Sequence, residues 1–463
     1  MDALVLARWQ FGITTVYHFL FVPLTLGLSM LVAILQTFYY RTRDEDYLRL
    51  TKYFGKLFVI CFTLGVVTGI VQEFQFGMNW SEYSRFVGDI FGIPLAIEAL
   101  TAFFIESTFL GLWIFGWNRL SEKVHLACIW LVAIASSLSA IWILAANAWM
   151  QHPVGYVINN GRAELADFVA VLLNERMLVQ APHVIIAGFV TGGLFVLGIS
   201  LWQVLRHNQR EIFLKSARIA LVFSAVASLL TATTGHRQAQ DTVQTQPMKM
   251  AAMEGLWESE QPASFSLFAL HDQANRVSHR EVRLPWLLSV LAHNNTTSEV
   301  KGMLELEEEM IATHGEGSYL PPVFVVYWSF RIMVGLGMLF LAASFYGLWL
   351  WWRGKLGDTR WYQRLAVALI FLPYVANTTG WLVTEMGRQP WVVYGLLRTT
   401  DGVSPMVSAG SVWFTTVGFT LIYGLLAGVA VFLIHKFARP GVATSDPAVE
   451  SGDDKKRQDA WAY

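Results

Sequence analysis

Ionisable and sulfur-bearing side chains lie within or at the ends of long apolar segments of this sequence. They are His18, Glu98, Glu106, His183, Arg331, Met333, Glu385 and Arg388. An ionisable residue at membrane depth is costly and by default indicates a functional site. Histidine and methionine are typical axial ligands of a low-spin haem iron. A carboxylate is a harder ligand that suits a high-spin iron, and arginine pairs well with haem propionates. These residue types therefore favour haem chemistry inside a helix bundle.

All of these side chains except Glu106 are predicted to lie in the same half of the membrane, the half that the charge pattern described below places outside. Scattered structural polar residues would not be expected to share a depth. Near the end of one apolar segment, Thr378, Trp381, Glu385 and Arg388 follow each other at i, i+3, i+7 and i+10. At 3.6 residues per turn they share one helix face, which should point into the bundle.

Glu98 and Glu106 lie on broadly the same side of one helix, with Glu106 roughly 12 Å further inward. Such a pair could pass protons from the middle of the membrane towards the outer cluster. Each candidate also has a structural interpretation. A lone membrane histidine is often only hydrogen-bonded, Met333 could be a core residue, and the two glutamates could pair with arginines. Arg388 could cap the carbonyls that end its helix.

The composition places the chain in a lipid bilayer. Of its 463 residues 54% are hydrophobic and 14% are charged, whereas soluble domains carry about 25% charged residues. The net charge of -1 gives no electrostatic support for nucleic-acid binding. Cys61 and Cys128 lie in apolar runs, so neither a disulfide framework nor a zinc site is indicated. The N-terminal MDALVLARWQ has no basic region or cleavage site, so no removable signal peptide is expected.

Nine apolar segments are long enough to cross a bilayer as helices, which takes about 20 residues. They run approximately over 12–39, 57–77, 90–117, 125–149, 183–205, 217–236, 323–352, 364–386 and 411–436. Lysine and arginine concentrate in alternate connections and in the C-terminal tail, which predicts an outside N-terminus and a cytoplasmic C-terminus. We therefore predict an all-α polytopic membrane bundle with nine transmembrane helices.

The chain divides into four parts on this basis. Residues 1–236 hold helices one to six, 237–322 form a long polar connection outside the membrane, and 323–436 hold helices seven to nine. Residues 437–463 read as a disordered cytoplasmic tail. A structureless connection as long as 237–322 would be unusual unless it were functional, and its segment 299–315 has a helix-like pattern.

Seven segments carry a resemblance to a known family. They are RWQFGITTVYHFLFVPLTLGL at 8–28, EALTAFFIE at 98–106, SAIWILAANAWMQHPVG at 139–155, APHV in the fifth helix, QPMKMAAMEGLWE at 246–258, FRIMVGLG at 330–337 and WLVTEMGRQPW at 381–391. In these segments and their order, the chain resembles subunit I of the bacterial cytochrome bd-type quinol oxidases, in the version with a short quinol-binding loop. The resemblance runs from about residue 5 to residue 436.

The resemblance implies three haems: a low-spin haem b, a high-spin haem b and a chlorin, haem d, which a haem b could replace. By motif position, His183 and Met333 would be the axial ligands of the low-spin haem, with Arg331 beside it. His18 and Glu385 would be the axial ligands in a di-haem oxygen site. Family members differ in which pocket holds haem d, so the resemblance assigns neither of these two residues to a named haem.

The same resemblance gives roles to the surrounding residues. Glu98 would face the oxygen site, Trp381 would be the bridging aromatic residue and Arg388 would pair with a propionate. A proton pathway would comprise Glu106, Ser139 and Asn147. The long connection would bind quinol, a substrate that releases protons on oxidation, through Lys249 and Glu254. An exposed carboxylate could receive those protons; the alternative for this pair is a solvated loop helix.

The implied activity is oxidation of ubiquinol or menaquinol at the outer face, coupled to reduction of oxygen to water with cytoplasmic protons. This would generate proton motive force without pumping. The implied partners are subunit II and one or two small single-helix subunits, in the bacterial cytoplasmic membrane. Three alternatives stay open from the sequence: a transporter or proton channel without haem, a cytochrome b that passes electrons to another subunit, and an oxidase that holds only haem b.

Overall fold

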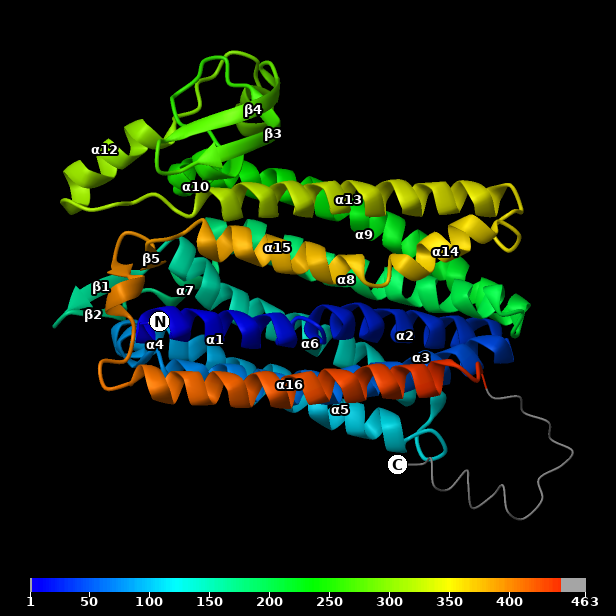
Figure 1. Ribbon diagram of the computed structural model, residues 1–463. Helices are drawn as coiled ribbons and strands as arrows, with labels where there is room; N and C mark the ends of the chain where they lie inside the picture. The colour runs from blue at the N-terminus through cyan, green and yellow to red at the C-terminus, as the bar shows by residue number, and fades with distance from the viewer. Residues whose placement is uncertain (1, 443–463) are drawn as a thin grey trace, which may run out of the picture.

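The computed structural model describes residues 2–442 and is a bundle of long, roughly aligned helices (Figure 1). Within this part of the chain, nine helical segments are long and apolar enough to cross a membrane. The prediction of a nine-helix membrane bundle is therefore confirmed. The connection before the seventh span projects beyond one end of the bundle, which we call the loop end, and the N-terminus lies at the same end (Figure 1). The predicted tail lies almost entirely outside the described residues.

Two of the predicted spans are each broken into two helices. The first consists of α1 (Ala3–His18) and α2 (Val22–Thr42), and the eighth consists of α14 (Arg360–Ala368) and α15 (Leu372–Met386). In both, a proline follows the break in the first turn of the second helix, where its missing N–H is tolerated. The proline ring also disfavours the helical conformation of the residue before it, which favours a break at this point. The first break places His18 at the very end of α1.

The third span changes its helical pitch in the middle. It consists of α4 (Ser81–Ile97), a π-helical segment η1 (Glu98–Phe103) and α5 (Phe104–Phe115). The π-helical segment begins at Glu98, one of the predicted site residues. Single π-turns inside α-helices occur frequently at functional sites.

The remaining spans are continuous helices: α3 (Glu45–Met78), α6 (Glu122–Gln151), α8 (Glu175–Leu205), α9 (Arg210–Thr245), α13 (Val323–Trp352) and α16 (Ala409–Ala438). All are as long as predicted or longer, and the extensions of α8 and α9 bear on the candidate site. His183 does not open its helix, because α8 begins at Glu175, where Asn174 caps it. Helix α9 continues to Thr245, so the polar connection begins later than residue 237. A hydropathy profile falls below the threshold for a span at charged residues, whereas the helix itself can continue through them.

The loop end also carries strands, which the all-α prediction missed. Three antiparallel pairs form: β1 (Tyr156–Asn159) with β2 (Arg162–Leu165), β3 (Phe265–Asp272) with β4 (Val277–Leu284), and β5 (Trp391–Val393) with β6 (Leu397–Arg398). Short helices α7 (Phe168–Leu172) and η2 (Thr399–Asp401) lie between these elements and the spans.

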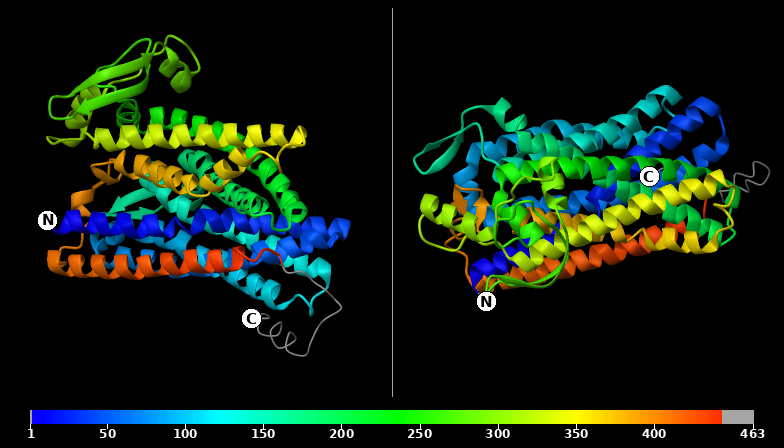
Figure 2. Two further views of the ribbon diagram at one scale, coloured as in Figure 1. Left: turned by 45° about the vertical axis from the view of Figure 1, so that its right-hand side comes forward. Right: turned by 90° about the horizontal axis from the view of Figure 1, so that it is seen from above.

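The connection between α9 and α13 is a folded unit rather than an open loop. It contains α10 (Pro247–Glu254), the β3–β4 pair, α11 (Leu287–His293) and α12 (Met303–His314). Helix α12 confirms the helix-like pattern of 299–315. The left view of Figure 2 shows the strand pair of this unit lying over the first part of α13, on the outside of the bundle. Its helix α10 lies closest to the bundle and packs against α9 and α13.

Backbone contact between α2 and α8 holds the bundle centre together. A Cβ atom on Gly27 would lie 2.6 Å from the Cα atom of Gly192, so the two helices approach more closely than any side chain allows. Small residues permit such close approach between membrane helices. Helix α8 is buried along most of its length, and it carries His183.

Candidate functional site

Glu385, near the end of α15, is the centre of a hydrogen-bonded group at the loop end. It accepts a hydrogen bond from Asn147 Nδ2 of α6 at 2.9 Å and another from Arg388 Nη2. Asn147 in turn accepts a hydrogen bond from Gln180 Nε2 of α8 at 2.8 Å. The structure thus brings together three predicted residues, Asn147 from one sequence segment and Glu385 and Arg388 from another. Gln180, three residues before His183, was missed by the sequence analysis.

Helix α6 supplies a hydrogen-bond donor to each of three acidic side chains. Ser136 donates to Glu106, Ser139 donates to Glu98 and Asn147 donates to Glu385. The three donors lie within one face of α6, given 3.6 residues per turn. The predicted order, with Ser139 and Asn147 continuing from Glu106, therefore needs an addition. Ser136 is the direct partner of Glu106, and the i, i+3 spacing of the two serines was the signal available.

His18 is oriented by a threonine on α3. Its Nδ1 atom lies 2.9 Å from Thr68 Oγ1, whose hydroxyl has the carbonyls of Leu64 and Gly65 at 3.0 Å. Because the hydroxyl donates to a carbonyl, its oxygen is left to accept from Nδ1–H. This tautomer leaves the Nε2 lone pair available, and within residues 2–442 no hydrogen-bond partner of Nε2 is found. Next to it, the ring of Phe19 meets that of Trp381 edge-on at 5.9 Å.

His183 is oriented in the same way by α9. Its Nδ1 atom lies 3.1 Å from the carbonyl oxygen of Thr231 and 3.3 Å from Thr234 Oγ1. A carbonyl can only accept, so Nδ1 carries the proton and the Nε2 lone pair is available. This arrangement is typical of metal-ligating histidines. A hollow of about 280 Å³ opens beside it, lined by Leu178, Val179, Pro182, Thr233, Thr234 and Arg237.

Met333 lies on α13, which packs against both α9 and α15. Its sulfur faces Gly380 of α15 so closely that a Cβ atom there would lie 2.9 Å from it. The two predicted ligands of the low-spin haem thus come from α8 and α13, the two helices that pack on α9.

Arg331 joins the bundle to α10. Its Nη2 atom lies 2.7 Å from Glu254 Oε2, and Nη1 donates to the carbonyl of Met253 at 3.1 Å. The side chains of Arg331 and Glu254 are 10% and 1% exposed. The expectation that Glu254 is an exposed carboxylate on a solvated helix is therefore wrong, because α10 is buried between the rest of the connection and the spans. Burial raises the pKa of Glu254, and the charge of Arg331 opposes that shift.

Lys249, five residues before Glu254 on α10, is buried as well. Its Nζ atom donates to Gln151 Oε1 at 2.6 Å, at the end of α6. Its aliphatic chain passes over Gly387, where a Cβ atom would lie 2.7 Å from Lys249 Cγ. Lys249 therefore lies against the segment that connects Glu385 to Arg388. The solvated-helix interpretation is wrong for this residue too.

A buried ion pair near Lys249 was also missed. Arg176 Nη1 lies 2.6 Å from Asp241 Oδ2, joining α8 to α9. Burial first, then the charges of Arg176 and Arg388, hold the pKa of Lys249 well below its usual range, against the opposing effect of Glu385 and Asp241. The pair was overlooked because both of its members lie beyond the predicted helix ends.

The donor set suits haem on two grounds. Two histidines with available Nε2 atoms, a buried thioether and a carboxylate provide the ligand types found at haem iron. In addition, Arg331 Nε and Arg388 Nη1 are buried and have no hydrogen-bond partner among the described residues. Buried polar groups are normally paired, and a propionate carboxylate would supply such a partner.

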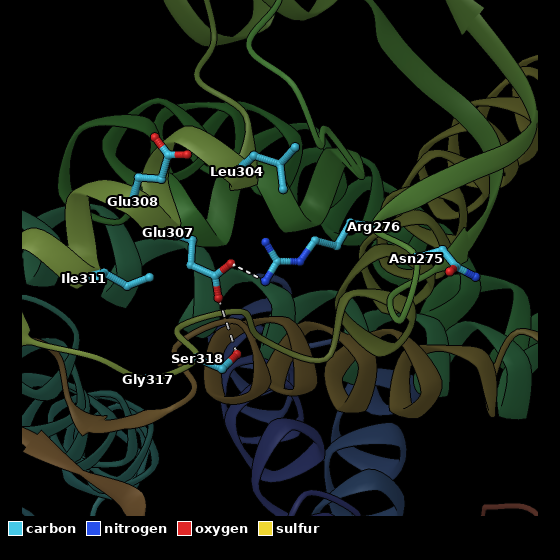
Figure 3. Close-up of a pocket in the computed structure, with 8 residues that line it drawn as sticks. All are labelled: Asn275, Arg276, Leu304, Glu307, Glu308, Ile311, Gly317 and Ser318. Carbon is cyan, nitrogen blue, oxygen red and sulfur yellow. Dashed lines mark hydrogen bonds and ion pairs between the residues drawn. The ribbon is translucent and has the colours of Figure 1, made fainter.

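A separate hollow of about 750 Å³ lies in the connection, away from all of the predicted site residues. Figure 3 shows Arg276 and Glu307 pointing towards each other inside it, as an ion pair of 3.0 Å. The other lining residues are Asn275, Leu304, Glu308, Ile311, Gly317 and Ser318. Its central charges pair with each other, and Glu308 is the remaining charged residue in the lining.

The sequence profile of the family described as cytochrome bd terminal oxidase subunit I matches residues 6–442. This chain belongs to that family. It is 49% identical to the cytochrome bd ubiquinol oxidase subunit 1 of Bacillus subtilis (strain 168), over 95% of this chain and 94% of that protein. It is 39% identical to the cytochrome bd-II ubiquinol oxidase subunit 1 of Escherichia coli (strain K12), over 95% and 97% of the two chains.

A solved structure supports the same membership. The bd oxidase from Geobacillus thermodenitrificans aligns with a TM-score of 0.86 and 27% sequence identity, over 95% of this chain and 98% of that one. As a cytochrome bd subunit I, the chain is a multi-pass membrane protein and part of a respiratory terminal oxidase, an enzyme complex with haem cofactors.

Proposed function

We propose that this chain is the subunit of a bd-type quinol oxidase that binds the haems and oxidises ubiquinol or menaquinol at the loop end. Oxygen is reduced to water inside the bundle. The observation that carries this proposal is the shared arrangement of His18 and His183. Each has Nδ1 fixed by a neighbouring helix and Nε2 without a partner among the described residues. Both side chains come from motifs that the family resemblance assigns to haem.

His183 and Met333 would hold a low-spin haem b, while His18 and Glu385 would hold a high-spin haem b and a haem d or second haem b. Trp381 would lie between these groups, and Arg331 and Arg388 would bind propionates through the N–H groups that lack partners. When bound, the haems supply the one-electron steps that connect quinol oxidation to oxygen reduction. The protein fixes the ligands and excludes water around them.

Glu254 would accept a proton from quinol. Its raised pKa makes it a better proton acceptor than an ordinary surface carboxylate would be. Arg331 keeps it in place through the ion pair at 2.7 Å. Lys249, whose Nζ atom already donates to Gln151 Oε1 at 2.6 Å, would donate a hydrogen bond to a quinol oxygen. Protons released here would leave at the loop end.

Protons for water formation would enter from the opposite end of the bundle. Glu106 is buried and hydrogen-bonded to Ser136, and the next acidic group along α6 is Glu98, bound to Ser139. A proton moving along this face would reach Asn147 and the oxygen site. Uptake at one end and release at the other separates charge across the membrane. Proton motive force would arise without a pumping step.

The opposite end would face the cytoplasm and the loop end would face outside, which the bias of lysine and arginine towards alternate connections supports. The complex would lie in the bacterial cytoplasmic membrane with subunit II and one or two small single-helix subunits. Within the chain, the connection before α13 would be the quinol-binding unit. The spans on either side of it would be the haem-binding part.

Oxygen uptake by the purified complex tests the activity. With a reduced quinol analogue as the only electron donor, oxygen consumption should track quinol oxidation, at two quinols for each oxygen molecule. Quinol oxidation without oxygen consumption would mean that electrons leave to another acceptor, and the oxidase proposal would fail.

A further inference from the structure

Three of the proposed haem-ligand side chains each face a glycine on a neighbouring helix. His183 of α8 faces Gly235 of α9, and His18 of α1 faces Gly69 of α3. Met333 of α13 faces Gly380 of α15 in the same manner. In each case a Cβ atom on the glycine would meet the ligand side chain before any other group.

Glycine is unfavourable inside a helix by about 1 kcal/mol relative to alanine. Close packing against a neighbouring side chain is one reason for a glycine inside a spanning helix. Gly77 and Gly337, on two of the same helices, have nothing within 4 Å of a Cβ atom. Gly77 shares α3 with Gly69, and Gly337 shares α13 with Met333, so these two glycines are controls without a steric contact.

At His183 two atoms of the ring lie within 3.3 Å of the position of the added atom. A Cβ atom on Gly235 would lie 2.9 Å from Cε1 of the imidazole and 3.3 Å from Nδ1. The ring cannot rotate away freely, because Nδ1 is held by Thr231 and Thr234 of the same helix. These three residues of α9 form the surface against which the ring packs. Two of them accept a hydrogen bond from Nδ1–H, and the glycine leaves room for the edge of the ring.

We propose that Gly235 is a positioning residue for the low-spin haem, and that Gly69 and Gly380 act in the same way on His18 and Met333. This rests on the proposed haem ligation. Each glycine lets a neighbouring helix lie directly against a ligand side chain and set its orientation. A ligand's outer partners typically change metal affinity on the order of 10- to 100-fold when they are altered.

The three positions should differ in sensitivity. Gly235→Ala meets a rigid ring held by two acceptors, so it should have the largest effect. Gly69→Ala would place Cβ at 3.1 Å from His18 Cε1, a contact that a shift of a few tenths of an ångström relieves, and its effect should be smaller. Gly380→Ala meets the end of a methionine, which is flexible and adapts easily, so it should have the smallest effect.

The experiment compares purified complexes of Gly235→Ala, Gly69→Ala and Gly380→Ala with the matched controls Gly77→Ala and Gly337→Ala. The readouts are the reduced-minus-oxidised spectrum, the haem-to-protein ratio and the rate of haem transfer to apomyoglobin. Gly235→Ala should shift or lose the low-spin haem b band and speed its transfer on the order of tenfold. The two controls should match the wild type in all three measurements.

His183→Ala separates failure of this inference from failure of the proposed function. If that variant keeps the low-spin band, the ligand assignment itself is wrong. If it loses the band while Gly235→Ala keeps wild-type spectrum and haem transfer, the ligation stands and the positioning role of Gly235 is overturned. Equal effects in Gly235→Ala and the control Gly337→Ala would also overturn it, because they would reflect helix packing in general.

Discussion

Glu254→Gln should strongly destabilise the loop end, because it removes the carboxylate that pairs with the buried guanidinium of Arg331. The two charges lie 2.7 Å apart and are 1% and 10% exposed, so solvent screens them little. Removing one partner of a buried ion pair costs about 3–5 kcal/mol. The Met253 carbonyl and the rings of Tyr327 and Phe265, at 4.5 and 4.7 Å, still stabilise the arginine. The cost should therefore fall near 3 kcal/mol, about two orders of magnitude in the folding equilibrium.

The assay is equilibrium unfolding of the purified complex in mixed detergent, followed by haem absorbance at mildly alkaline pH. Alkaline conditions keep Glu254 ionised despite its raised pKa. A double variant, Glu254→Gln with Arg331→Met, removes both charges of the pair. It should be more stable than the sum of the two single losses predicts, because the proposed propionate contact of Arg331 is lost in both variants that lack the arginine. Glu309→Gln is the matched control, since its pairing with Lys301 is solvent-exposed and should contribute nothing measurable.

A double-mutant cycle decides the outcome. The cycle compares the stability of Glu254→Gln, of Arg331→Met and of the double variant with that of the wild type. If both single variants are nearly as stable as the wild type, or if their losses of stability simply add, the buried pair does not exist in the complex. The structural argument that ties α10 to α13 would then be refuted. A coupled loss would support the pair as the link between the connection and the bundle.

Other variants test the proton and haem assignments. Glu106→Gln should slow quinol-driven oxygen uptake at least several-fold while the spectrum keeps all haem bands; a wild-type rate would remove it from the pathway. Ser139→Ala should slow uptake in the same assay, whereas Ser137→Ala, whose hydroxyl only meets its own helix backbone, should not. His183→Ala should lack the low-spin band in a difference spectrum, and its survival would refute the ligation. Because burial raises the pKa of Glu254, the rate should fall as pH decreases through that raised pKa. That low-pH limb should be missing from the residual activity of Glu254→Gln.

Hydropathy was enough to predict the nine spans, because a spanning helix must be apolar over about 20 residues. It could not give the true helix ends. Helix α8 begins at Glu175 and α9 ends at Thr245, and both ends are polar. The breaks before α2 and α15 had a visible signal in Pro23 and Pro373, which the apolar runs obscured.

The site shows the same division between local and long-range information. The residue types and motifs identified Glu385 and Lys249 as candidates. Residue types and motifs do not show, however, which distant segments bury a side chain. Lys249 is covered because Gly387 and Gln151, far apart in the sequence, meet it at the loop end. Arg176 was missed for a related reason, since its partner Asp241 is only adjacent once α8 and α9 pack together.

The central claim is that this bundle holds haem through histidines that neighbouring helices orient by hydrogen bonds to Nδ1. The most direct measurement is the reduced-minus-oxidised optical spectrum of the purified complex, recorded for the wild type and for His183→Ala. The account predicts haem b bands in the wild type, with or without a chlorin band, and loss of the low-spin component in the variant. A wild-type complex without haem bands, or a variant with an unchanged spectrum, would contradict it.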